Sequence, residues 1–108
     1  MEFKEINKFV DGEIKRLEKY YDIKADEELT LAMALKIGEE LGELFNEVLA
    51  HKGYQRKSKL DKLDKKEIEG EFADVVLTTF MLARRFDIDI GSALKDKISK
   101  IQGRNYNE

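Results

Sequence analysis

Apolar residues recur with the helical period of three to four positions in four separate segments of the chain. The segments run from about residue 2 to 20, 26 to 51, 65 to 86 and 90 to 101. No segment shows the alternation typical of a strand, and the chain has no proline to interrupt a helix. The pattern therefore predicts an all-α fold, a four-helix bundle-like domain.

Residues at the ends of these segments mark where helices begin and end. Asp26 and Asp89 are suited to cap the starts of the second and fourth helices, and Gly53 suits the end of the second. Only residues 86–89 connect the third and fourth helices, so the two are expected to form an antiparallel hairpin. A length of 108 residues fits a single domain covering residues 1–108.

Composition excludes several classes of function. The net charge of −3 argues against a dedicated nucleic-acid-binding surface. The absence of cysteine excludes disulfides, thiolate metal sites and cysteine nucleophiles. No apolar stretch reaches membrane-spanning length, and the first residues lack the apolar core of a signal peptide. These features predict a cytoplasmic protein that has neither nucleic acid nor membrane as a partner.

Two acidic pairs lie in apolar surroundings, Glu40 with Glu43 and Glu71 with Asp74. Residues three apart share a helix face, so each pair can point in one direction. Glu40 lies at the edge of the apolar stripe of its helix (Leu29, Met33, Ile37, Leu41, Leu44 and Val48), and Glu39 lies further round. Burying an uncompensated carboxylate costs on the order of a few kcal/mol. A bound cation compensates that cost, and the two pairs therefore predict a metal site.

The alternative for Asp74 is a salt bridge with a lysine or arginine, or a cap on a neighbouring helix. If the site binds metal, its all-oxygen ligands favour Mg²⁺ or Mn²⁺ over zinc. A di-iron bundle needs Glu-x-x-His motifs, and His51, the single histidine, does not follow an inward glutamate at that spacing.

The third helix is apolar on two faces. One face carries Ile68, Phe72, Val76, Phe80 and Ala83, and the other carries Leu77, Thr78 and Met81 around Asp74. A helix that is apolar nearly all round must be covered on several sides. In a domain of this size the second face indicates a subunit interface, so we expect a homo-oligomer.

The long connection of residues 52–64 is basic and has two interpretations. It is either a solvated loop or a flap over an anionic ligand, with Tyr54 stacking on a base and Arg56 near the phosphates. Gly38 and Gly42, on either side of Glu40, indicate either close helix packing or room for metal and phosphate.

The sequence Glu39-Glu40-x-x-Glu43 with Glu71-x-x-Asp74, in the contexts 34–44 and 73–77, resembles the signature of the MazG-type all-α nucleoside triphosphate pyrophosphohydrolases. The resemblance covers roughly residues 29–106. It implies Mg²⁺-dependent cleavage of a nucleoside triphosphate between the α and β phosphates, with removal of non-standard nucleotides as a role, by a homodimer or a dimer of dimers (homotetramer). It also implies that Glu40, Glu43, Glu71 and Asp74 bind the metal and that Glu39 orients water or supports the ligands.

Basic residues that can stabilise the pyrophosphate leaving group are Lys36, Lys97, Lys100 and Arg104, each of which is otherwise a solvated surface residue. Gln102 or Asn105 can stand where several family members have an asparagine, so the base and sugar preferences stay open. A phosphoribosyl-ATP pyrophosphohydrolase and a non-catalytic interaction or nucleotide-sensing module are the alternatives.

Overall fold

The computed structural model describes residues 1–21, 26–54 and 64–105 of the chain. Four helices occupy these ranges: α1 (Phe3–Tyr21), α2 (Asp26–His51), α4 (Lys65–Arg85) and α5 (Ile90–Gln102). The described ranges contain no strand, so the predicted all-α class is confirmed. No helix in them has the length and apolarity needed to cross a membrane.

The predicted helix ends agree closely with the structure. The Asp89 side chain accepts a hydrogen bond of 2.9 Å from the backbone N–H of Gly91, which makes it the N-cap of α5. Asp64 caps α4 in the same way, by accepting from the N–H of Lys66. Gly53 adopts a φ of 80°, the left-handed conformation that ends helices and favours glycine. The side chain of Asp26 lies outside the described residues.

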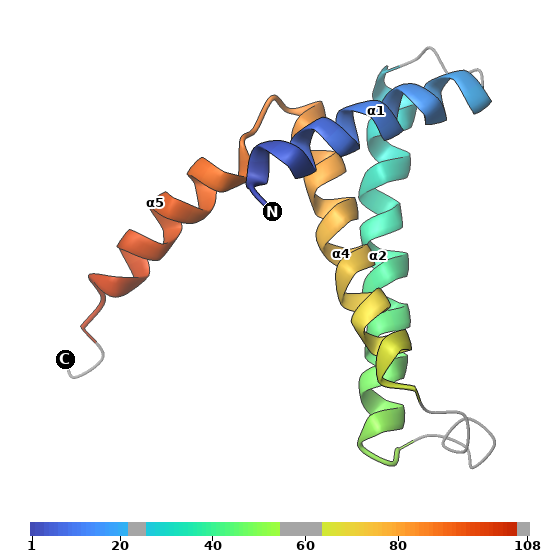
Figure 1. Cartoon of the computed structure of the whole chain (residues 1–108), viewed down its shortest axis with the longest axis vertical. Helices are drawn as coiled ribbons and strands as arrows, with labels where there is room; N and C mark the ends of the chain where they lie inside the picture. The colour runs from blue at the N-terminus through green and yellow to red at the C-terminus, as the bar shows by residue number, and fades with distance from the viewer. Residues whose placement is uncertain (22–25, 55–63, 106–108) are drawn as a thin grey trace.

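Helices α2 and α4 lie side by side and antiparallel, and α1 crosses them at one end (Figure 1). At the crossing, Ile14, Leu29 and Met33 form a small buried cluster, against which Leu17, Met81 and Leu82 pack. Because residues of α1, α2 and α4 all contribute to this packing, it holds α1 in place across the other two helices.

Polar contacts hold α1 in place beside this cluster. Arg84 of α4 donates two hydrogen bonds to the Asp11 carboxylate, from Nε at 2.9 Å and from Nη2 at 3.0 Å. Arg85 reaches Glu18 of α1 at 3.5 Å and donates to the Thr30 hydroxyl of α2 at 3.2 Å. The two consecutive arginines therefore tie the end of α4 to both neighbouring helices.

Helix α5 projects away from the other three (Figure 1), and none of its residues is buried. The expected packing of α4 and α5 as a hairpin is therefore wrong within one chain. Phe3 stacks on Phe80 at a centroid distance of 6.1 Å and lies against the first turn of α5. A Cβ at Gly91 would lie 3.0 Å from Phe3 Cδ2, so the glycine allows this aromatic side chain to approach the start of α5 closely.

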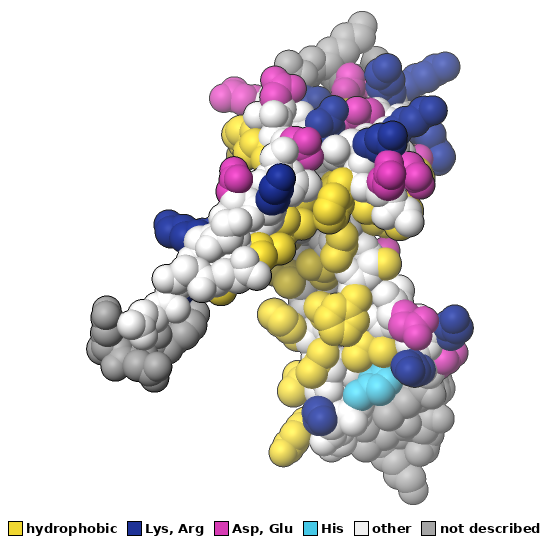
Figure 2. Space-filling view, turned by 60° about the vertical axis from the view of Figure 1, so that its left-hand side comes forward, with side chains coloured by type: hydrophobic (Ala, Val, Ile, Leu, Met, Phe, Trp, Pro, Cys, Tyr) yellow, Lys and Arg dark blue, Asp and Glu magenta, His cyan; other side chains and the backbone are white. Residues whose placement is uncertain are grey.

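Many apolar side chains remain exposed in the single chain. Figure 2 shows hydrophobic side chains gathered in a band down the middle of one face. Phe72 and Val76, expected on the core face of α4, are 53% and 49% exposed, whereas Phe80 and Ala83 on the same face are buried. The core prediction was therefore right only for the end of α4 that α1 covers.

Candidate metal site

Three glutamates from two helices converge on one point between α2 and α4. One carboxylate oxygen from each of Glu40, Glu43 and Glu71 lies within 4.8 Å of the others. Glu40 and Glu43 share a face of α2 because they are three positions apart, and the antiparallel packing of α4 brings Glu71 opposite them. Pure oxygen ligands at this spacing suit a divalent cation such as Mg²⁺.

Burial distinguishes two of these three carboxylates, those of Glu40 and Glu71, from ordinary surface acids. Glu40 is only 6% exposed, Glu71 is half-buried and Glu43 is exposed. Glu39, the neighbouring acid, is exposed as its position on the helix predicted.

The Oε2 atoms of Glu40 and Glu71 are buried and accept no hydrogen bond from any described residue. A buried oxygen without a partner costs on the order of 1–3 kcal/mol. Two such atoms in a cluster of like charges fit a bound cation, which satisfies both at once.

The electrostatics of Glu71 reflect this crowding. Loss of solvation, followed by the nearby charges of Glu43 and Asp74, raises the pKa of the Glu71 carboxyl above its usual value. Glu40 and Glu47 act in the same direction. Glu47 was absent from the predicted site, although it follows Glu43 by one helical turn and the same spacing argument would have found it.

Asp74 lies close to this cluster but outside the group of three. Its carboxylate is exposed, and it is near enough to raise the pKa of Glu71. Its backbone carbonyl accepts a hydrogen bond of 2.8 Å from the Thr78 hydroxyl. Among the described residues, Asp74 forms no salt bridge. This part of the chain therefore gives no support to the alternative that Asp74 pairs with a lysine or arginine.

Lys36 lies beside the cluster on α2. Its ammonium group is 3.3 Å from Glu40 Oε1 and 3.5 Å from Glu39 Oε2. The hydrogen bond to Glu40, more than the other neighbouring charges, raises the pKa of Lys36. The lysine side chain remains half-exposed, so its charge is accessible to an anionic ligand.

Gly38 and Gly42 lie on the face of α2 opposite Glu40, because residues two positions apart in a helix are about 200° apart. A Cβ built at either position meets no described atom within 4 Å beyond the backbone of its own helix. Close helix packing within one chain therefore does not explain these glycines, and their position does not support the interpretation that they leave room for metal and phosphate beside Glu40.

A family model, the MazG nucleotide pyrophosphohydrolase domain, matches residues 27–107. The chain belongs to this family. The match takes in all four predicted metal ligands, and the family is generally dependent on divalent metal. Searches of curated proteins and of solved structures each gave no match.

A cleft of about 460 Å³ lies among α1, α2 and α4 of this MazG domain. Lys36 forms part of its wall, so the cleft and the metal site adjoin. Side chains from α1, α2 and α4 line it: Glu13, Leu17, Leu29, Ala32, Met33, Lys36, Thr78 and Met81. Apolar walls with a few polar groups at the edge are typical of small-molecule sites.

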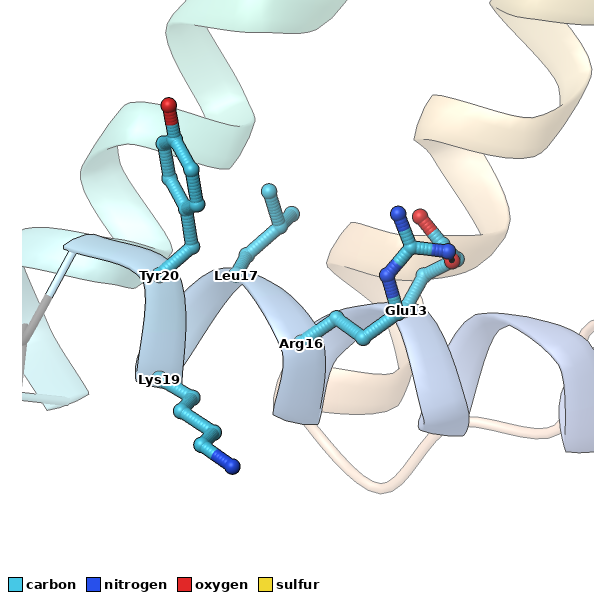
Figure 3. A pocket seen from close by; sticks show the side chains of 5 residues that line it. All are labelled: Glu13, Arg16, Leu17, Lys19 and Tyr20. Carbon is cyan, nitrogen blue, oxygen red and sulfur yellow. Dashed lines mark ion pairs between the residues drawn. The ribbon is translucent and has the colours of Figure 1, made fainter.

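A second hollow, of about 640 Å³, lies along α1 and shares Glu13 and Leu17 with the cleft. In Figure 3, Leu17 and Tyr20 project from one side of α1, Lys19 projects from the other, and Arg16 pairs with Glu13. Neither Lys36 nor any of the four predicted metal ligands lines this hollow, so we assign it no part in the candidate site.

The predicted phosphate contacts are not brought to the carboxylates within one chain. Lys97, Lys100 and Arg104 belong to or follow α5, which projects away from the α2–α4 pair (Figure 1). Tyr54 is 78% exposed just after α2, and Arg56 lies outside the described residues. In the described part of the single MazG domain, Lys36 is the predicted basic residue that contacts the acidic cluster.

Proposed function

We propose that this protein is a Mg²⁺-dependent nucleoside triphosphate pyrophosphohydrolase that cleaves between the α and β phosphates, releasing a nucleoside monophosphate and pyrophosphate. The observation that carries the proposal is the convergence of Glu40, Glu43 and Glu71 in a MazG domain, with two of their buried oxygens unpartnered.

The three glutamates, joined by Asp74, are the residues that would hold the metal. When bound, a divalent ion neutralises phosphate charge and lowers the pKa of a coordinated water. Glu39 would orient the attacking water or support the residues that hold the metal. The protein supplies no covalent nucleophile in this reaction.

Lys36 acts on the leaving group in this proposal. Its ammonium group lies between Glu39 and Glu40 and keeps an exposed side toward the adjoining cleft. A fixed positive charge that faces the developing pyrophosphate charge lowers the barrier for cleavage.

The cleft beside Lys36 is the place for the nucleoside. The planar base would lie against the apolar wall to which Leu17 and Met33 contribute, with the polar groups of Glu13 and Thr78 at its edges. The two methionines, Met33 and Met81, are flexible and adapt to different shapes. We therefore expect several bases to be accepted, which suits an enzyme that removes non-standard nucleotides.

The test is to incubate the purified protein with Mg²⁺ and a panel of NTPs, dNTPs and phosphoribosyl-ATP, measuring pyrophosphate and orthophosphate separately. Pyrophosphate release from at least one compound is expected. Release of orthophosphate instead, or no turnover of any compound, would refute the proposal. Turnover of phosphoribosyl-ATP alone would select the neighbouring activity.

A non-catalytic interaction or nucleotide-sensing module is the second candidate, favoured by the exposed apolar residues on α2, α4 and α5. The same residues support a homodimer or homotetramer as the active unit. Mg²⁺ with a non-hydrolysable nucleotide should raise the melting temperature if the metal site is intact. A pure interaction module gives no such shift, and a sensor gives the shift without turnover.

A further inference from the structure

The cleft among α1, α2 and α4 has one polar lining residue from each helix. These are Glu13 of α1, Lys36 of α2 and Thr78 of α4, and the rest of the lining is apolar. In a mostly apolar site, a few polar groups orient the ligand and provide its specificity. The choice between nucleobases therefore depends on what these three side chains donate and accept.

Thr78 can act toward a ligand only as a hydrogen-bond acceptor. Its hydroxyl donates to the backbone carbonyl of Asp74 at 2.8 Å, and the carbonyl of Val75 lies 3.1 Å from the same Oγ1. A hydroxyl has a single hydrogen, and these two carbonyls of α4 share it. The lone pairs of the Thr78 oxygen are what remains for a ligand in the cleft.

Glu13 is the second acceptor of the cleft. An ionised carboxylate has no hydrogen to donate and offers two oxygens, each with two lone pairs. Arg16 approaches one of them, with Nη1 2.9 Å from Oε1 (Figure 3). The Glu13 side chain is half-buried, whereas that of Arg16 is almost fully exposed. The ion pair therefore holds the carboxylate from the solvent side and leaves both of its oxygens with capacity to accept.

The charges of Glu13 and Lys36 give the cleft a direction. Lys36 is bound to Glu39 and Glu40 beside the metal site, and its positive charge attracts phosphates. A carboxylate repels phosphates, so Glu13 suits the uncharged base at the other end of a nucleotide. Among the lining residues that the structure describes, the base thus meets two acceptors, Glu13 and Thr78.

The base that matches paired acceptors is guanine. Its N1–H and 2-amino group are adjacent donors on one edge, and a carboxylate accepts both as parallel hydrogen bonds. Hypoxanthine lacks the amino group, and xanthine has a carbonyl oxygen in its place, which an acceptor repels. Adenine and cytosine each offer an amino group next to a ring nitrogen that only accepts. Uracil and thymine have carbonyl oxygens on both sides of one N–H.

We propose that Glu13 is a specificity-determining residue, which selects guanine nucleotides by accepting hydrogen bonds from N1–H and from the 2-amino group. Bases with one usable donor bind in the same cleft with lower affinity, since Met33 and Met81 adapt to their shapes. This inference rests on the proposed function only for the placement of the nucleoside in the cleft.

GTP and ITP provide the test, because they differ only in the 2-amino group. We expect kcat/KM for pyrophosphate release to be about tenfold or more higher for GTP, as for one hydrogen bond to a charged acceptor. Glu13→Gln replaces one accepting oxygen with an amide that donates. The variant should lose the preference for GTP over ITP and gain activity on XTP relative to GTP, because the amide can donate to the xanthine carbonyl. Glu5→Gln removes the same charge from an exposed position of α1 outside the cleft, and it should keep the wild-type ratios.

Equal kcat/KM values for GTP and ITP in the wild type would overturn the inference, as would a Glu13→Gln variant with unaltered ratios. Pyrophosphate release without discrimination leaves the proposed function intact. Melting temperatures with Mg²⁺ and the α,β-methylene analogues of GTP and ITP measure the selection without turnover. A larger rise with the GTP analogue, lost in Glu13→Gln, supports the inference in the absence of any hydrolysis. Equal rises, or none with either analogue, overturn it.

Discussion

Lys36 engages only one of the two carboxylate oxygens of Glu40. The ammonium group is 3.3 Å from Oε1, whereas Oε2 is buried and accepts no hydrogen bond from the described residues. A lysine that neutralised the buried acid fully would leave no role for a cation. The Glu40 carboxylate, with one oxygen paired and the other unpaired, instead lies close to the carboxylates of Glu43 and Glu71. The salt bridge to Lys36 therefore holds Glu40 in position and leaves Oε2 available to a cation.

Replacing Lys36 with methionine tests whether the charge of this side chain is needed for cleavage. The apolar stem is retained and the charge is lost, so we expect kcat for pyrophosphate release to fall by roughly 10²-fold, as for removal of one donor to a developing charge. Steady-state kinetics measure the change. Lys66→Met, which removes an exposed lysine of α4 paired with Glu69, is the control and should leave kcat unaltered. A fall in both variants would contradict a specific role for Lys36.

Glu71→Gln should stabilise the metal-free protein. The folded-state pKa of Glu71 is raised above 4.5 by loss of solvation and by Glu43 and Asp74, so ionising it opposes folding. As pH rises from 4.5 through the raised value, the wild type loses free energy of unfolding, and the variant lacks this loss. Urea denaturation in EDTA across this range measures the effect. With Mg²⁺ the order should reverse, because the variant binds the ion poorly; a variant less stable in EDTA would contradict the interpretation.

Glu43→Gln and Asp74→Asn should abolish pyrophosphate release while preserving the helical circular dichroism spectrum. Both side chains are exposed, so neither substitution disturbs the core. Each should also remove the rise in melting temperature that Mg²⁺ gives the wild type. Glu69→Gln, an exposed glutamate on α4, is the matched control. If Asp74→Asn retains full activity, the metal site consists of the three glutamates alone.

The helices and the two α2 members of the glutamate cluster were predictable because both depend on local spacing. Asp89 indicated the start of its helix because aspartate is a common N-cap residue. The position of Glu40 beside the apolar stripe of α2 indicated its burial. The direction of α5 was not predictable from local spacing, and its first turn lies against Phe3, which is nearly ninety positions away in sequence. The exposure of Phe72 was not predicted, for a related reason. The apolar pattern shows that a side chain favours burial, and it does not show whether the same chain or another molecule buries it.

Asp11→Asn should destabilise the packing of α1 by about 1 kcal/mol, the size expected for a partly exposed ion pair. The hydrogen bond from Arg84 holds the pKa of Asp11 below 3.8 in the folded protein. The stabilisation is therefore fully present above pH 3.8 and is lost as pH falls through the lowered value, and the variant lacks this part of the pH dependence. Chemical denaturation at acid pH and at neutral pH measures the difference. Glu2→Gln, which removes an exposed pair with Lys4, should have almost no effect.

Ala32→Trp tests whether the cleft beside Lys36 holds the nucleoside. Ala32 is exposed and lines the cleft, so a tryptophan there fills space that the base needs without displacing buried side chains. We expect KM for the nucleotide to rise about tenfold or more, the effect of losing about 1.4 kcal/mol of binding. The melting shift given by Mg²⁺ alone should be unchanged, because the carboxylates are untouched. Ala34→Trp, also exposed on α2 but not part of the cleft, is the control and should keep the wild-type KM. If Ala32→Trp leaves KM unaltered while the control behaves as expected, the base binds elsewhere and the assignment of the cleft is wrong.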